Sequence, residues 1–132
     1  MEKKKIYTVA TAHLDTIWSW DFETTVSKYI YNTLVDNFAL FKKYPHYTFN
    51  FEGSYRYELM EEYYPELFNE MKGYIESGRW NVCGSSFENG DMNVPSPEAL
   101  FRNILFGNSY FDKKFGKRSV DIYLPDCFGF GW

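Results

Sequence analysis

The sequence predicts an α/β fold in which strands and helices alternate as βαβαβαβ around a parallel sheet. Four short runs are rich in β-branched and aromatic residues, as buried strands of parallel sheets are. The longer stretches between them repeat apolar residues at helical spacing, with proline or glycine near their ends. Strand and helix patterns that alternate in this way favour parallel strands joined by right-handed crossovers.

The first strand and the first helix occupy the N-terminal third of the chain. The run KIYTVATA, residues 5–12, predicts a buried strand. Apolar residues then recur at helical spacing at Val26, Ile30, Leu34, Phe38 and Phe41. This pattern predicts a helix that ends before Pro45, because proline clashes with the preceding turn of a continuing helix.

The second strand and helix follow directly. YTFNFEG, residues 47–53, alternates as a strand does and stops at Gly53. Residues 55–77 have a helical pattern that Pro65 interrupts and Gly78 closes. We therefore expect a broken helix between the second and third strands.

The last third of the chain predicts two more strands around a long helix. RWNVCGSS, residues 79–86, is the third expected strand, and SVDIYLPD, residues 119–126, is the fourth. Between them, Ser96 suits a helix N-cap, with Pro97 at the first helical position and Glu98 in the first turn. The sequence ends at Trp132, soon after the fourth run, so we expect this unit to be a truncated part of a larger α/β barrel.

Composition indicates one globular domain over residues 1–132. Hydrophobic residues make up 45% and charged residues 24%, which argues against a disordered chain. The net charge of −4 gives no support for nucleic-acid binding, and no apolar segment is long enough for a signal peptide or a membrane span. Cys83 and Cys127 stand alone, which fits packed thiols in a reducing compartment and predicts a cytoplasmic protein.

Polar side chains at the strand ends form a candidate metal site. Ligands of parallel α/β folds bind outside the carboxyl ends of the strands, where His13 and Asp15 follow the first strand and Asp126 follows the fourth. Residues two apart on an extended chain point the same way, so this mixed nitrogen and oxygen set can converge on zinc or a neighbouring divalent metal. The alternatives for His13 and Asp15 are a buried hydrogen bond between them or a solvated turn, and the alternative for Asp126 is an aspartate that hydrogen-bonds within its own loop.

Other strand-end residues leave several roles open. Glu88 and Asp91 could act as acid or base, accept hydrogen bonds from substrate, or face water; the turn context around Asp91 favours substrate contact. Trp18 could stack on a sugar or cap the first strand. Glu52 is given no role, and His46 precedes the second strand, at the wrong end of the sheet.

Three long segments together resemble a known enzyme family. They are AHLDTIWSW, NVCGSSFENGDMNVPSPEALFRNILFG and FGKRSVDIYLPDCFGFGW. In this order and spacing, from Ile6 to Trp132, they resemble the N-terminal part of the catalytic domain of glycoside hydrolase family 38, the α-mannosidases. The similarity is to bacterial-type members that lack a signal peptide.

The resemblance implies a fold and a metal site. The catalytic domain would be a seven-stranded, barrel-like parallel α/β unit, followed in the family by helical and β-rich domains. His13 and Asp15 match two ligands of one divalent metal ion, zinc first and cobalt second. Asp126 matches both a ligand and the catalytic nucleophile.

The resemblance also implies a substrate site and a reaction. Trp18 and Phe128 match residues that line the mannose site, and Asp91 matches an acid that contacts substrate hydroxyls. The implied reaction is retaining, metal-dependent hydrolysis of terminal α-mannosidic bonds of oligosaccharides. Members are several times longer, and their general acid and last ligating histidine lie downstream of the residues present, so we expect this chain to be inactive alone.

Partners and alternative functions follow from the same residues. We expect a mannose-containing oligosaccharide as partner, no nucleic acid and no membrane, and association into homo-oligomers through exposed strand edges. A metal-dependent deacetylase or amidohydrolase is the alternative enzyme, and release of acetate or ammonia would identify it. A non-catalytic sugar-binding module is the alternative outside enzymes, and sugar affinity that a chelator leaves unchanged would identify it.

Overall fold

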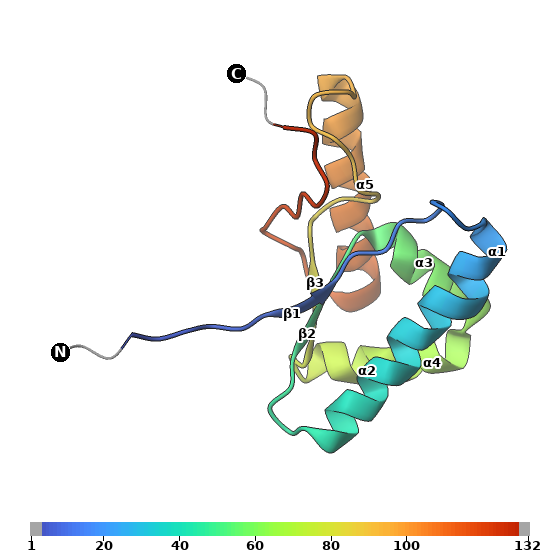
Figure 1. Cartoon of the computed structure of the whole chain (residues 1–132), viewed down its shortest axis with the longest axis vertical. Helices are drawn as coiled ribbons and strands as arrows, with labels where there is room; N and C mark the ends of the chain where they lie inside the picture. Colours follow the sequence, from blue (N-terminus) through green and yellow to red (C-terminus); the bar gives the residue numbers. More distant parts are fainter. Residues whose placement is uncertain (1–3, 130–132) are drawn as a thin grey trace.

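A three-stranded parallel sheet organises the protein in the computed structural model, which describes residues 4–129. The strands are β1 (Ala10–Ala12), β2 (Phe49–Glu52) and β3 (Trp80–Cys83), and β2 lies in the middle. Ala10 pairs with Phe49, and Phe49 with Trp80, so the three strands start and end nearly level. Their carboxyl ends therefore meet at one edge of the sheet (Figure 1).

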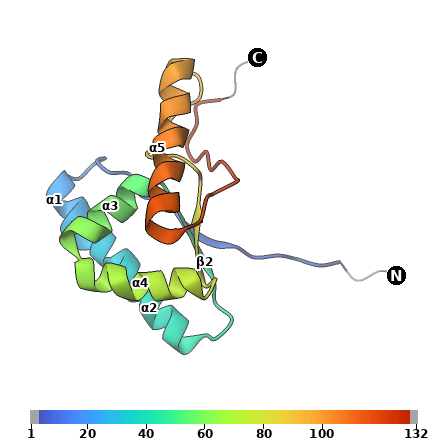
Figure 2. The same cartoon turned by 180° about the vertical axis from the view of Figure 1, so that it is seen from behind.

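Helices connect the strands as the sequence predicts. α1 (Phe22–Thr24), the π-helix η1 (Thr25–Ile30) and α2 (Tyr31–Lys43) form one continuous helical run between β1 and β2. The next crossover consists of α3 (Ser54–Tyr63) and α4 (Pro65–Glu76), which confirms the predicted break at Pro65. α5 (Pro97–Phe115) follows β3. Figure 2 shows α5 beside α3, and Tyr57 of α3 contacts Phe111 of α5 with ring centroids 5.2 Å apart.

Aromatic side chains fill the space between the sheet and the helices. Phe49 and Phe51 of β2 are stacked with ring centroids 5.8 Å apart, and Trp80 of β3 meets Phe49 edge-on at 4.9 Å. Phe41 of α2 and Tyr57 of α3 complete this buried cluster from the helical side. Much of the high aromatic content therefore serves packing rather than ligand binding.

The ends of α5 have the capping chemistry that the sequence predicts. The Ser96 hydroxyl accepts a hydrogen bond from the backbone N–H of Ala99 at 3.2 Å, and Pro97 occupies the first helical position. At the other end, Gly116 adopts a left-handed conformation with φ of 61°, which glycine enters without steric cost.

Two strand predictions need correction. The first strand is only three residues long, and Ile6, Tyr7 and Val9 before it are exposed. The fourth strand, predicted over residues 119–126, is wrong: this segment is irregular. Side chains there replace a strand ladder, because Asp121 Oδ2 accepts the Gly84 N–H at 3.1 Å and Ser85 Oγ donates to the Asp121 carbonyl at 2.5 Å.

The fold contains no candidate membrane-spanning helix within residues 4–129.

Candidate functional site

His13 lies at the centre of the candidate site. It comes directly after β1. Its Nε2 atom is 3.2 Å from Asp15 Oδ1 and 3.4 Å from Asp126 Oδ2. Its other ring nitrogen, Nδ1, is 3.3 Å from Oε1 of Glu52 at the end of β2. The structure thus brings together the three residues that the sequence predicts as metal ligands, and adds a buried carboxylate behind the histidine.

One imidazole nitrogen and two carboxylates are donors that zinc and neighbouring divalent metals accept. Two ligands bound at about 2.1 Å to one tetrahedral zinc ion are about 3.4 Å apart, close to the two Nε2–carboxylate distances. His13 Nε2 is buried and has no hydrogen-bond partner, so its lone pair or proton is unused. Nevertheless, no group of three or more His, Cys, Asp and Glu side chains within residues 4–129 is already arranged to hold a metal ion. The Asp126 side chain is 82% exposed and is free to rotate toward a cation.

Asp126 has an unusual backbone conformation. Its φ is +55°, in the left-handed region that residues other than glycine seldom occupy, aspartate and asparagine being the most frequent exceptions. Backbone strain of this kind is frequent where a functional side chain must point in one direction. Here it accompanies a carboxylate that faces His13 from a loop rather than from a strand.

A hollow of about 630 Å³ opens beside the three predicted ligands. Asp15, Trp18, Asp126, Cys127 and Phe128 line it. The Trp18 and Phe128 rings are 75% and 93% exposed, so neither belongs to the core. An open, partly aromatic hollow with two acids suits a ligand that has both hydroxyl groups and apolar faces, as sugars do.

Asp91 lies outside this lining and organises the loop beside it. Its Oδ1 accepts the Asn93 N–H at 2.7 Å and its Oδ2 accepts the Phe128 N–H at 2.8 Å. These two backbone donors lower the pKa of Asp91 below its usual value, because they stabilise the charged carboxylate. The predicted contact of Asp91 with substrate stays a prediction.

Glu52 is the site residue that the sequence interpretation missed. Its side chain is completely buried, and Oε1 accepts a hydrogen bond from Asn89 Nδ2 at 2.8 Å in addition to its contact with His13. Arg56, four residues later on α3, is also buried, and its Nη1 lies 4.0 Å from Glu52 Oε2. The spacing of Glu52 and Arg56 across the strand–helix junction is compatible with this pair but does not reveal in the sequence that both are buried.

Arg56 also fixes the chain on either side of the site. Its Nε donates to the carbonyl of Leu14 at 2.8 Å, between His13 and Asp15 in the sequence. Its Nη1 is paired with Glu88 Oε1 at 2.5 Å, and the other oxygen of Glu88 accepts the Thr16 hydroxyl proton at 2.6 Å. Glu88, for which the sequence left several roles open, therefore ties the β3 exit loop to the β1 exit loop.

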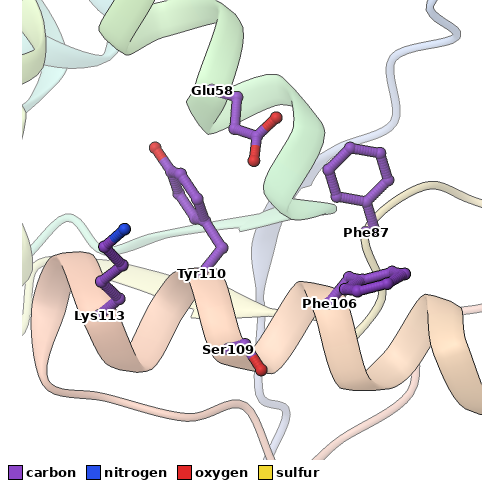
Figure 3. A pocket seen from close by; sticks show the side chains of 6 residues that line it. All are labelled: Glu58, Phe87, Phe106, Ser109, Tyr110 and Lys113. Atoms are coloured by element: carbon purple, nitrogen blue, oxygen red, sulfur yellow. The ribbon is translucent and has the colours of Figure 1, made fainter.

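A second hollow, of about 530 Å³, lies between α3 and α5 and includes no predicted site residue (Figure 3). Phe87 and Phe106 form an aromatic part of its wall, while Glu58 and Lys113 add opposite charges. Burial raises the pKa of Glu58. His46 borders a third hollow beside Ala10 and Thr48, at the amino ends of β1 and β2, which confirms its placement at the wrong end of the sheet.

Comparison with known proteins identifies the family. Residues 3–132 match the model described as Glycosyl hydrolases family 38 N-terminal domain. The chain is 31% identical over 126 residues to Alpha-mannosidase G of Dictyostelium discoideum and 32% identical over 126 residues to Alpha-mannosidase of Saccharomyces cerevisiae. It is 30% identical over 125 residues to Alpha-mannosidase 2C1 of Homo sapiens. These matches cover 95–96% of this chain but only 12% of each relative. The chain thus belongs to glycosyl hydrolase family 38 and corresponds to its N-terminal domain.

Proposed function

We propose that this chain provides the metal-binding and nucleophile-bearing part of a retaining α-mannosidase that removes terminal mannose from oligosaccharides. The observation that supports this most strongly is the position of His13 Nε2, within 3.4 Å of both Asp15 and Asp126 at the edge of the open hollow. The names of the relatives support mannose as the sugar.

His13, Asp15 and Asp126 would together hold one divalent metal ion, zinc in preference to cobalt. When bound, the ion supplies positive charge that keeps a carboxylate ionised and can bind sugar hydroxyls. The contacts of both acids with the imidazole nitrogen that has no hydrogen-bond partner, at 3.2 and 3.4 Å, support this set of ligands.

Asp126 is the proposed nucleophile. Its carboxylate attacks the anomeric carbon and forms a glycosyl ester while the bond from that carbon to the leaving oxygen breaks. Water then hydrolyses the ester and returns Asp126 as a carboxylate, with net retention at the anomeric carbon. Trp18 and Phe128 would receive the apolar faces of the sugar ring.

We assign the general acid and a further histidine ligand to parts of the complete protein outside these residues, since the chain spans 12% of its relatives' length. We also propose that the three-stranded sheet is part of a larger barrel-like domain. The two free cysteines, Cys83 and Cys127, favour a cytoplasmic setting.

A mannosyl fluoride with a second fluorine on the ring tests the nucleophile in this chain. Fluoride leaves with little help from an acid, so the reagent can label the nucleophile even where no general acid is present. We expect mass spectrometry to find the sugar on the peptide containing Asp126 in the zinc-loaded chain, and not in Asp126→Asn.

A matched glucosyl fluoride controls for non-specific glycosylation and should label weakly. A folded, zinc-loaded chain that gives no Asp126 adduct, or gives equal adducts with both sugars, would contradict the proposal. Turnover of an aryl α-mannoside by the isolated chain that disappears in Asp126→Asn would support the sugar assignment and overturn the assignment of the general acid to another segment.

A further inference from the structure

The carboxylate of Glu52 is buried directly behind His13. Its side chain has no exposed surface, although it ends a strand at the edge where the hollow lies. Oε1 contacts His13 Nδ1 at 3.3 Å and accepts the Asn89 Nδ2–H at 2.8 Å. Burying an ionised carboxylate costs several kcal/mol unless it is paired, so this position requires compensation from its surroundings.

The surrounding chain is shaped to accept this acid. Arg56, only 1% exposed, lies with Nη1 4.0 Å from the second carboxylate oxygen of Glu52. Gly84, just after β3, leaves the space that the Glu52 side chain uses, because a β-carbon at Gly84 would lie 2.9 Å from that of Glu52. Three segments therefore contribute: Glu52 supplies the buried charge, Arg56 supplies its positively charged partner, and Gly84 leaves room for the side chain.

Two contacts decide which ring nitrogen of His13 carries the proton. An unprotonated Nδ1 would direct its lone pair at the Glu52 carboxylate 3.3 Å away, which is repulsive. A proton on Nε2 would face Asp15 at 3.2 Å and Asp126 at 3.4 Å, but neither contact has the alignment of a hydrogen bond, whereas the contact between Nδ1 and Glu52 has it. In the competing arrangement, Asn89 Nδ2 donates to His13 Nδ1. That contact is 3.2 Å long, whereas the bond from the same amide to Glu52 Oε1 is shorter, at 2.8 Å.

We infer that Glu52 is a positioning residue that accepts the Nδ1 proton of His13 and thereby directs the Nε2 lone pair toward Asp15 and Asp126. A carboxylate bonded to the far nitrogen of a ligating histidine fixes the ring and raises its basicity. The inferred proton position stands without a metal, whereas its consequence for metal affinity rests on the proposed function.

The first experiment measures the tautomer directly. The chain contains two histidines, so His46→Gln leaves one imidazole, and His46 is exposed at the opposite end of the sheet. Ring nitrogen chemical shifts would be recorded without metal, about two pH units above the ordinary histidine pKa of roughly 6.5. We expect the proton on Nδ1; a dominant Nε2–H form would overturn the inference.

The second experiment measures zinc affinity by chelator competition. Glu52→Gln keeps the size of the side chain and one acceptor but removes the charge, and we expect zinc affinity to fall about 10- to 100-fold. Glu61→Gln is the matched control, because Glu61 is a partly buried acid on α3 paired with Lys114, and it should leave zinc affinity unchanged. Equal zinc affinity in folded Glu52→Gln and the wild-type chain would overturn the inference.

The two readouts separate the inference from the proposed function. A wild-type chain that binds no zinc would contradict the metal site, while the tautomer measurement would still decide the role of Glu52. If Glu52→Gln does not fold, the tautomer of the His46→Gln chain decides alone.

Discussion

Asp91 holds the loop that follows the proposed nucleophile, since its Oδ2 accepts the backbone N–H of Phe128 at 2.8 Å. Asn in this position would keep one acceptor and lose the negative charge. We predict that Asp91→Asn increases the amide exchange rate of Phe128 about five- to ten-fold. This is the change expected when a hydrogen bond that contributes about 1 kcal/mol is lost. Asp112→Asn, which removes an acid paired with Arg118, is the control and should leave that rate unchanged.

The same contact predicts a pH dependence. Backbone donors of Asn93 and Phe128 lower the pKa of Asp91, so its contribution to loop stability is present above the unfolded value of about 3.9 and is lost as pH falls through the lowered folded pKa. The Phe128 amide resonance should therefore titrate with a midpoint below about 3.9. A midpoint at or above that value would show that the contact does not stabilise the charged form.

Trp18 and Phe128 should matter for ligand binding and not for folding. Both rings are largely exposed, so Trp18→Ala and Phe128→Ala should change the free energy of unfolding by less than about 0.5 kcal/mol. Each should lower labelling by the mannosyl fluoride by about five-fold, since a lost aromatic contact costs about 1 kcal/mol. Ile17→Ala, at an exposed neighbour outside the hollow, should change neither measurement, and a loss of labelling there would argue against a specific aromatic wall.

The two cysteines should differ in reactivity. Burial, followed by the charges of Asp121 and Glu52, raises the pKa of Cys83 to about 12, so almost none of its thiolate exists near neutral pH. Cys127 lines the open hollow. Iodoacetamide should therefore modify Cys127 well before Cys83, as peptide mass spectrometry would measure, and Cys127→Ser should leave only slow labelling. Equal rates at the two thiols would contradict this difference.

Gly107 lets α5 pack directly on the backbone that follows β3. A β-carbon there would lie 2.3 Å from the Ser85 carbonyl oxygen and 2.6 Å from the Phe87 nitrogen, and backbone atoms cannot rotate away. We expect Gly107→Ala to lower the free energy of unfolding by about 1–3 kcal/mol in denaturant titration. Gly73→Ala on α4, where a β-carbon would meet nothing within 4 Å beyond its own turn of helix, should instead stabilise by up to about 1 kcal/mol. A Gly107→Ala chain as stable as wild type would exclude the close packing.

Local patterns predicted most of the fold. Helical spacing, the break at Pro65 and the Ser96 cap are set by neighbouring residues, and the structure confirms them. The prediction of a fourth strand failed because the alternation of apolar and polar residues at Val120 and Ile122 does not reveal whether a partner strand is available. Both side chains are exposed in the structure. Ser119 and Asp121 instead accept hydrogen bonds from Ser85 and Gly84 in the loop after β3.

The candidate site was predictable only in part. The rule that parallel strands end at one edge predicted the proximity of His13 and Asp15 to a distant acid, although Asp126 reaches them from an irregular loop. Glu52 could not be assigned from its sequence, because an acid at a strand end has the same local pattern whether it faces water or is buried. Its burial depends on Arg56 and Gly84, which only the tertiary structure brings beside it.

Zinc binding by equilibrium dialysis and metal analysis tests the metal site most directly. We predict one zinc ion per chain, lost in His13→Ala and in Asp126→Ala, and retained in His46→Gln, whose imidazole lies at the amino ends of the strands. Zinc that binds His13→Ala as tightly as the wild-type chain, or a folded wild-type chain that binds none, would contradict a metal site formed by His13, Asp15 and Asp126.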